Sequence, residues 1–324
     1  PEADGQCRPD ADLDISRWSD GRSHAEQAAG LRKVLVGEFD RPDADAIDAL
    51  ARLHLRFGLG AESRTVLDGF EVKLADHDLL ADLARLIDGS DAVGPLARDI
   101  VCPGHHGLWL AIAGSPAMLA LDDVATQLEP TFAGLPPDLR NLLGPRLVTN
   151  LLEAGRNEAA RLILEIALRP GQPPAAPLIL ASGRLAAAEG RVEEAEDALA
   201  MLVERRAHNS GDAALALVAT RLAAGDRVPE EWITDLRTVA FEREGSPFAV
   251  TAATLVAEAE ARNGDIRESL AMLAALAAGS EDGRIAAHAL APRLLAEAGI
   301  EGTGAAVAEA ALEHHDLLAP APEH

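Results

Sequence analysis

The chain has 324 residues, of which 48% are hydrophobic and 25% are charged, so it can bury a sizeable core and is not a disordered acidic tail. Its 29 basic and 53 acidic residues give a formal net charge of −24, which would repel a phosphate backbone, so no nucleic-acid partner is expected. No apolar run reaches the roughly 18–20 residues that a transmembrane helix needs, so no membrane span is expected either.

Residues 1–24 are predicted to form an N-terminal extended segment. The first 14 residues are polar and acidic, show no helical periodicity and begin with Pro1 rather than Met. Such an opening is typical of the mature end of an exported protein, and a shortened chain is the alternative explanation.

Cys7 and Cys102 are the only cysteines. In an oxidising compartment they could form one disulfide that tethers the N-terminal segment and, in the chain-entropy model, removes about 4–5 kcal/mol of unfolded-state entropy. The alternative is two unrelated reduced thiols. The disulfide would favour a periplasmic or secreted protein, and the thiols would favour a cytoplasmic one.

From about residue 25, the sequence predicts short amphipathic helices, because apolar residues recur at spacings of three and four and alternating β-branched runs are absent. Residues 46–57 and 79–87 contain two such apolar stripes. Residues 25–140 are therefore predicted to form a divergent array of helical hairpins.

Glycine-containing breaks recur through the rest of the chain. Gly155, Gly190, Gly225, Gly264 and Gly299 follow one another at intervals of 35, 35, 39 and 35 residues. Each is expected just after a helix, because glycine tolerates the left-handed conformation found there. Periods of this length are typical of stacked helical hairpins, since one hairpin cannot bury both of its apolar faces alone.

Residues 176–209 show the pattern best, with Gly183 at position 8, Gly190 at position 15 and Ala195 at position 20 of a unit of 34 residues. In these positions the chain resembles the tetratricopeptide (TPR) repeat family. The resemblance implies an all-α fold: a right-handed α-solenoid of stacked antiparallel helical hairpins, with regular TPR-like repeats over residues 141–313. Residues 314–324 are predicted to form an acidic, proline-containing tail.

The resemblance also implies a binding surface, because the first helix of each hairpin lines the concave face of such arrays. Carried over unit by unit, it gives these candidates for a partner-binding groove: Leu152, Arg184, Leu215, Leu222, Glu258, Arg262 and Arg293. The three arginines could bind a protein or peptide partner that presents carboxylates. The alternative is that they pair with glutamates on the same or neighbouring helices.

Cys102, His105 and His106 form the densest group of potential metal ligands, although zinc needs four converging donors. A helical enzyme or metal-binding protein that uses this segment is therefore one alternative, against a simple Pro-Gly turn. No nucleophile elbow, phosphate loop or zinc-protease motif is present, and helix capping explains the paired carboxylates. We expect no catalytic residue, cofactor or metal, and a non-enzymatic protein–protein interaction scaffold in a cell-envelope assembly. An intracellular acidic adaptor is the remaining alternative.

Overall fold

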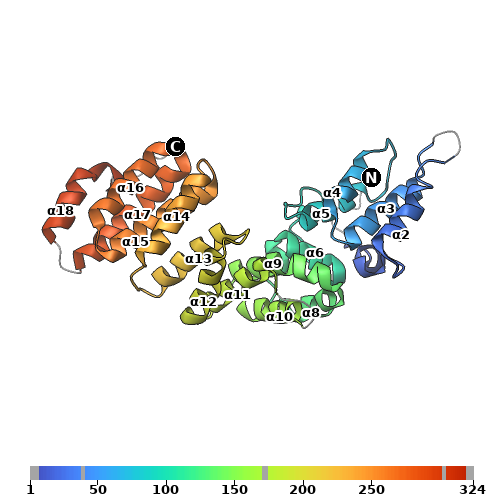
Figure 1. Ribbon diagram of the computed structural model, residues 1–324, viewed down its shortest axis with the longest axis horizontal. Helices are drawn as coiled ribbons and strands as arrows, with labels where there is room; N and C mark the ends of the chain where they lie inside the picture. The colour runs from blue at the N-terminus through green and yellow to red at the C-terminus, as the bar shows by residue number, and fades with distance from the viewer. Residues whose placement is uncertain (1–6, 38–40, 170–173, 301–303, 319–324) are drawn as a thin grey trace. The chain divides into compact units, whose positions relative to one another are not determined.

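The computed structural model describes residues 7–37, 41–169, 174–300 and 304–318. Over these residues the protein is all-α, as the sequence predicts: helices follow one another without a β-strand, and the only β pairing is an isolated bridge between Val36 and Pro42 (Figure 1). The chain divides into two compact units, which we call the N-terminal unit (residues 1–181) and the C-terminal unit (residues 182–324).

The helices of the N-terminal unit pack mostly against their neighbours in sequence: α3 contacts α4 and α5, while α9 and α8 both contact α10. Their bounds are α1 Asp10–Leu13, η1 Ile15–Arg17, α2 His24–Arg32, α3 Ala44–Arg56, α4 Gly60–Asp68, α5 His77–Ile87, η3 Pro95–Ala97, α6 Gly104–Ala113, α7 Pro116–Leu119, α8 Val124–Gly134, α9 Pro137–Glu153 and α10 Asn157–Ala167. Helix α11, Ala176–Ala188, contains the division between the units.

Local sequence explains the bounds of α3. The Asp43 side chain accepts a hydrogen bond from the Ala46 N–H at 3.0 Å and so caps the first turn. Ile47, Leu50 and Leu53 form the predicted stripe and are buried. After Phe57 the chain turns at Gly58, whose φ of 74° is one that glycine adopts without strain.

The loop after α5 is held by a buried carboxylate. Asp82 is fully buried and accepts hydrogen bonds from the N–H groups of Val93, Gly94 and Leu96 at 2.9–3.0 Å. Because these donors replace the water that the carboxylate loses on burial, Asp82 fixes η3 against α5.

In the C-terminal unit each helix again contacts the next, and alternate helices also meet: α13 contacts α15, and α15 contacts α17. The bounds are α12 Val192–Glu204, α13 Ser210–Ala223, α14 Glu230–Glu242, α15 Pro247–Asn263, α16 Ile266–Gly279, α17 Glu281–Ile300, α18 Gly304–Glu313 and η4 His315–Leu318. One apolar cluster joins α13, α14 and α15 around Val218, Ile233 and Val256, and a second joins α16, α17 and α18 around Leu273 and Leu294.

Most of the predicted helix-ending glycines adopt the left-handed conformation. Of the predicted breaks, these have positive φ angles: Gly155, Gly190, Gly225 and Gly264. Gly58 and Gly89, which follow α3 and α5, also have positive φ angles. At Gly299 the helix end is displaced by one position, because α17 ends at Ile300.

Two terminal predictions need correction. Residues 10–17, predicted to be extended, form α1 and η1, with Leu13 and Ile15 fully buried. At the other end, residues 315–318 form η4, and Leu317 is buried in the second apolar cluster of the C-terminal unit. The remainder of both segments, residues 1–6 and 319–324, lies outside the described residues.

Candidate functional site

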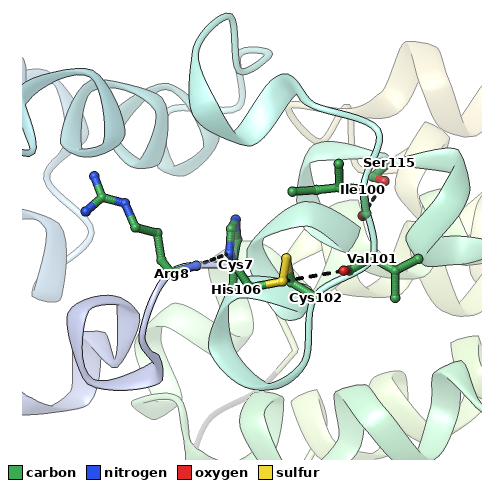
Figure 2. Close-up of a disulfide and its surroundings, with 7 residues drawn as sticks. All are labelled: Cys7, Arg8, Ile100, Val101, Cys102, His106 and Ser115. Carbon is green, nitrogen blue, oxygen red and sulfur yellow. Dashed lines mark hydrogen bonds between the residues drawn. A yellow bond between two sulfur atoms is a disulfide. The ribbon is translucent and has the colours of Figure 1, made fainter. Parts of the chain in front are cut away.

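Cys7 and Cys102 form a disulfide, 95 positions apart in sequence, with their Cα atoms 5.5 Å apart (Figure 2). Cys102 is fully buried just before α6, and Cys7 is exposed. The predicted bridge is therefore present, and the alternative of two reduced thiols is not what the structure holds. Its effect is to fasten the start of the described chain to the loop that precedes α6.

Hydrogen bonds extend this fastening along the N-terminal segment. The Arg8 N–H donates to His106 Nδ1 at 2.9 Å, and the His105 N–H donates to the Asp10 carboxylate at 2.6 Å (Figure 2 for Arg8 and His106). Further along, Trp109 Nε1 donates to the Leu13 carbonyl at 3.2 Å. We call residues 7–15, with their contacts to α6, the N-terminal clasp; it depends on these bonds and on buried apolar side chains as well as on the disulfide.

The clasp accounts for the residues suspected of binding metal. Cys7, Cys102 and His106 have potential ligand atoms within 4.8 Å of one another. The two sulfurs, however, are bonded to each other, and His106 Nδ1 accepts the Arg8 N–H. Burial lowers the pKa of His106, which keeps the ring neutral and able to accept that bond.

His105 is directed elsewhere. Its Nδ1 lies 2.8 Å from Asp10 Oδ2, and its Nε2 lies 3.5 Å from Asp14 Oδ1. The predicted group of Cys102, His105 and His106 is thus not assembled as one ligand set in the oxidised chain. The metal-binding alternative would therefore require the reduced chain.

The candidate groove residues fall in both units. Leu152 is half-buried on α9 of the N-terminal unit, and Arg184 is half-buried on α11. Leu222 is buried and Leu215 half-buried on α13, where both contribute to the apolar cluster of α13, α14 and α15. Sequence register had placed these leucines on an open surface, but the adjacent helices cover Leu222.

The structure brings together Glu258, Arg262 and Arg293. Each of them forms an ion pair between helices. Arg293 Nη2 lies 2.8 Å from Glu258 Oε1, and Arg262 Nη2 lies 3.7 Å from Glu297 Oε2. Both pairs join α15 to α17. The structure therefore supports the alternative reading of Arg262 and Arg293, in which neighbouring glutamates neutralise them.

A hollow that the sequence did not reveal lies between α12, α13 and α14. Its volume is about 540 Å³. Buried apolar side chains of α13 and the half-buried Trp232 of α14 line it, and carboxylates surround them. In sequence the carboxylates of α14 resemble ordinary helix-capping acids. The one available signal was Trp232, a rare aromatic residue beside two glutamates in a chain with only 3% aromatic residues.

No protein-family model matches the chain, and comparisons with curated proteins and with solved structures find no match either. Among the described helices, none combines the length and the apolarity required to cross a bilayer. Function therefore has to be argued from the geometry of the clasp, the paired helices and the hollow.

Proposed function

We propose that the protein is a non-enzymatic protein–protein interaction scaffold, built as a TPR-like, right-handed solenoid of stacked helical hairpins. The observation that supports this most is the offset between residues that pair across helices. Glu258 pairs with Arg293 and Arg262 with Glu297, each 35 positions further along the chain. In stacked repeats, equivalent positions of successive first helices face one another, so the offset of a contact equals the repeat length.

A second contact has the same offset. Asn263, the last residue of α15, donates from Nδ2 to the Val228 carbonyl at 2.8 Å and accepts the Val228 N–H on Oδ1 at 3.0 Å. Because Asn263 and Val228 are also 35 positions apart, the offset is found in the loops as well as along the helix faces. Arrays of this kind present an extended surface to partners, which supports an interaction function.

The disulfide supports an exported protein. Disulfides persist in oxidising compartments and are rare among cytosolic proteins, so we place the scaffold in the periplasm or outside the cell, within a cell-envelope assembly. An intracellular acidic adaptor would have to keep this bond intact against a reducing environment.

A partner that presents carboxylates to Arg262 and Arg293 stays a prediction, and it would have to displace Glu297 and Glu258. Displacing an existing ion pair cancels most of the gain from the new one. The pairs therefore favour a structural role for these two arginines, and partner binding is better sought on another face.

Affinity capture tests the proposed function. The oxidised full-length chain serves as bait in a native envelope extract, and the same bait after heat denaturation serves as the control. The proposal expects one protein that co-elutes only with the folded bait, at a fixed mass ratio measured by light scattering. Recovery of nothing beyond the proteins bound by the denatured bait would contradict it.

A further inference from the structure

The hollow of the C-terminal unit has apolar side chains at its floor and sides, within a lining that is polar over most of its area. Ala214 and Leu217 of α13 are buried beneath it, and Val203 of α12 and Val239 of α14 are half-buried at its sides. A volume of about 540 Å³ falls in the usual range for ligand pockets and holds several side chains. Apolar side chains of a ligand that contact Ala214, Leu217 and Trp232 would be shielded from water there.

Charged side chains line the same hollow, and they are mostly acidic. Glu204, Glu231, Asp235 and Glu242 form no ion pair with any residue that the structure describes, and Arg206 is the only basic residue among the lining side chains. Four carboxylates and one guanidinium group leave the lining with a net charge of −3.

The arginines of α13 and α14 do not pair with these acids, because they are engaged with other glutamates. Arg221 Nε lies 2.8 Å from Glu196, and Arg237 pairs with Glu260. The negative charge is therefore available to a ligand from outside the chain.

One of the two aromatic residues of α14 belongs to the hollow. Trp232 lines the hollow, and the Arg221 guanidinium lies over its ring, 5.4 Å from the centroid, which holds the indole in place. Phe241, on the same helix and next to the lining residue Glu242, is 78% exposed. Nine helical positions amount to two and a half turns, so Phe241 and Trp232 point to opposite sides of α14, and only Trp232 belongs to the hollow.

We infer that this surface, formed by α12, α13 and α14, docks a cationic amphipathic segment of a partner protein, with apolar side chains in the hollow and Lys or Arg side chains on the surrounding carboxylates. The inference rests on the proposed scaffold function and specifies its surface. The charge favours a basic segment, and the apolar floor together with Trp232 favours one that also has an apolar face.

The probe is an 18-residue helical peptide of leucine and lysine, and its match is the same peptide with glutamate in place of lysine. Isothermal titration with the full chain should give one site for the lysine peptide and none for the glutamate peptide. The E231Q/D235N double variant should weaken binding at least tenfold. Its matched control is E193Q/D197N, which also removes two exposed charges four residues apart, in the turns of α12 that precede the lining residues, and should change affinity less than twofold.

Equal weakening by the two double variants would show only bulk attraction to an acidic protein and would overturn the inference. Phe241→Ala removes an exposed aromatic side chain from the side of α14 opposite Trp232, so affinity should change less than twofold; a loss as large as that of E231Q/D235N would count against the inference. In the affinity capture from envelope extract, failure of the E231Q/D235N bait to capture the partner protein would support docking at the hollow. Undiminished capture by that variant would overturn the docking site while leaving the scaffold function standing.

Discussion

Glu258 on α15 and Arg293 on α17 form an ion pair with 2.8 Å between Oε1 and Nη2, and they are 35 positions apart in the chain. Four residues further along each helix, Arg262 and Glu297 pair with the charges reversed. The two helices thus lie side by side in the same direction, and the offset equals the interval that separates most of the predicted glycine breaks.

A double-mutant cycle on Glu258 and Arg293 tests this register. Each single alanine variant should lose under about 1 kcal/mol of unfolding free energy, with a coupling of roughly 0.5 kcal/mol, because the arginine is half exposed to water. Exchanging the two charges in E258R/R293E should restore most of the loss. Urea unfolding at low salt measures all four proteins. No coupling at low salt, and no recovery in the exchanged variant, would contradict the pairing.

His54 should make the N-terminal unit less stable in acid. It is 1% exposed, and its Nδ1 lies 2.9 Å from His24 Nε2 of α2. Burial, reinforced by the charges of His24 and Arg32 and opposed by Glu62, lowers the pKa of His54 from 6.5 to about 4. Between these values the unfolded chain binds the proton and the folded chain does not, so stability is complete above about pH 6.5 and falls toward pH 4.

At pH 5 this loss amounts to about 2 kcal/mol. Thermal unfolding from pH 8 to pH 4.5 measures it, and His54→Asn, which keeps a polar nitrogen near the Nδ1 position, is the comparison. The variant should show a shallower slope in this window. The same slope in both proteins would show that His54 does not titrate as described.

Reduction of the Cys7–Cys102 disulfide should destabilise the N-terminal unit alone. The chain-entropy model gives about 4–5 kcal/mol for a loop of 95 residues. The C-terminal unit contains no cysteine and is the internal control. Calorimetry with and without dithiothreitol should show one transition moving to lower temperature while the other stays. A thiol assay on the denatured, unreduced chain should find no free thiol; two free thiols, or unchanged melting, would contradict the clasp.

Gly183 on α11 should not tolerate a side chain. A Cβ atom there would lie 2.7 Å from Leu199 Cγ on α12, so Gly183→Ala should cost about 1–3 kcal/mol through overpacking. At Gly279, the last residue of α16, no atom lies within 4 Å of such a Cβ. Gly279→Ala should be neutral or stabilising in the same urea titration. Equal stability of the two variants would show that α11 and α12 do not pack this closely.

The sequence predicts the helices well because their signals are local. The Asp43 cap, the stripe of α3 and the turn at Gly58 depend on residues within one or two helical turns of one another. The disulfide between Cys7 and Cys102 could be predicted because the chain has no other cysteine. By contrast, the burial of Leu13 depends on α6, about 90 residues away, and that of Ile15 depends on α3, so the sequence alone predicted an extended segment.

The candidate groove residues were predicted only in part, and the hollow was not predicted, because both depend on how neighbouring helices pack. Repeat register placed Glu258, Arg262 and Arg293 on the same faces of α15 and α17, and that is where they lie. Register alone does not say which charged groups of adjacent helices come within bonding distance, nor that Leu222 is covered. The hollow depends on how far α12, α13 and α14 stand apart, and no single segment of sequence encodes that distance.

Site-specific photocrosslinking in the native envelope tests the central claim most directly, namely that the protein is a scaffold that binds a partner through α14. A benzoylphenylalanine replaces Thr238, an exposed residue of α14 that lines the hollow, in one variant and the exposed Leu312 of α18 in the other. We expect a single cross-linked envelope protein from position 238 and none from position 312. The same adducts from both positions, or none from position 238, would contradict the claim.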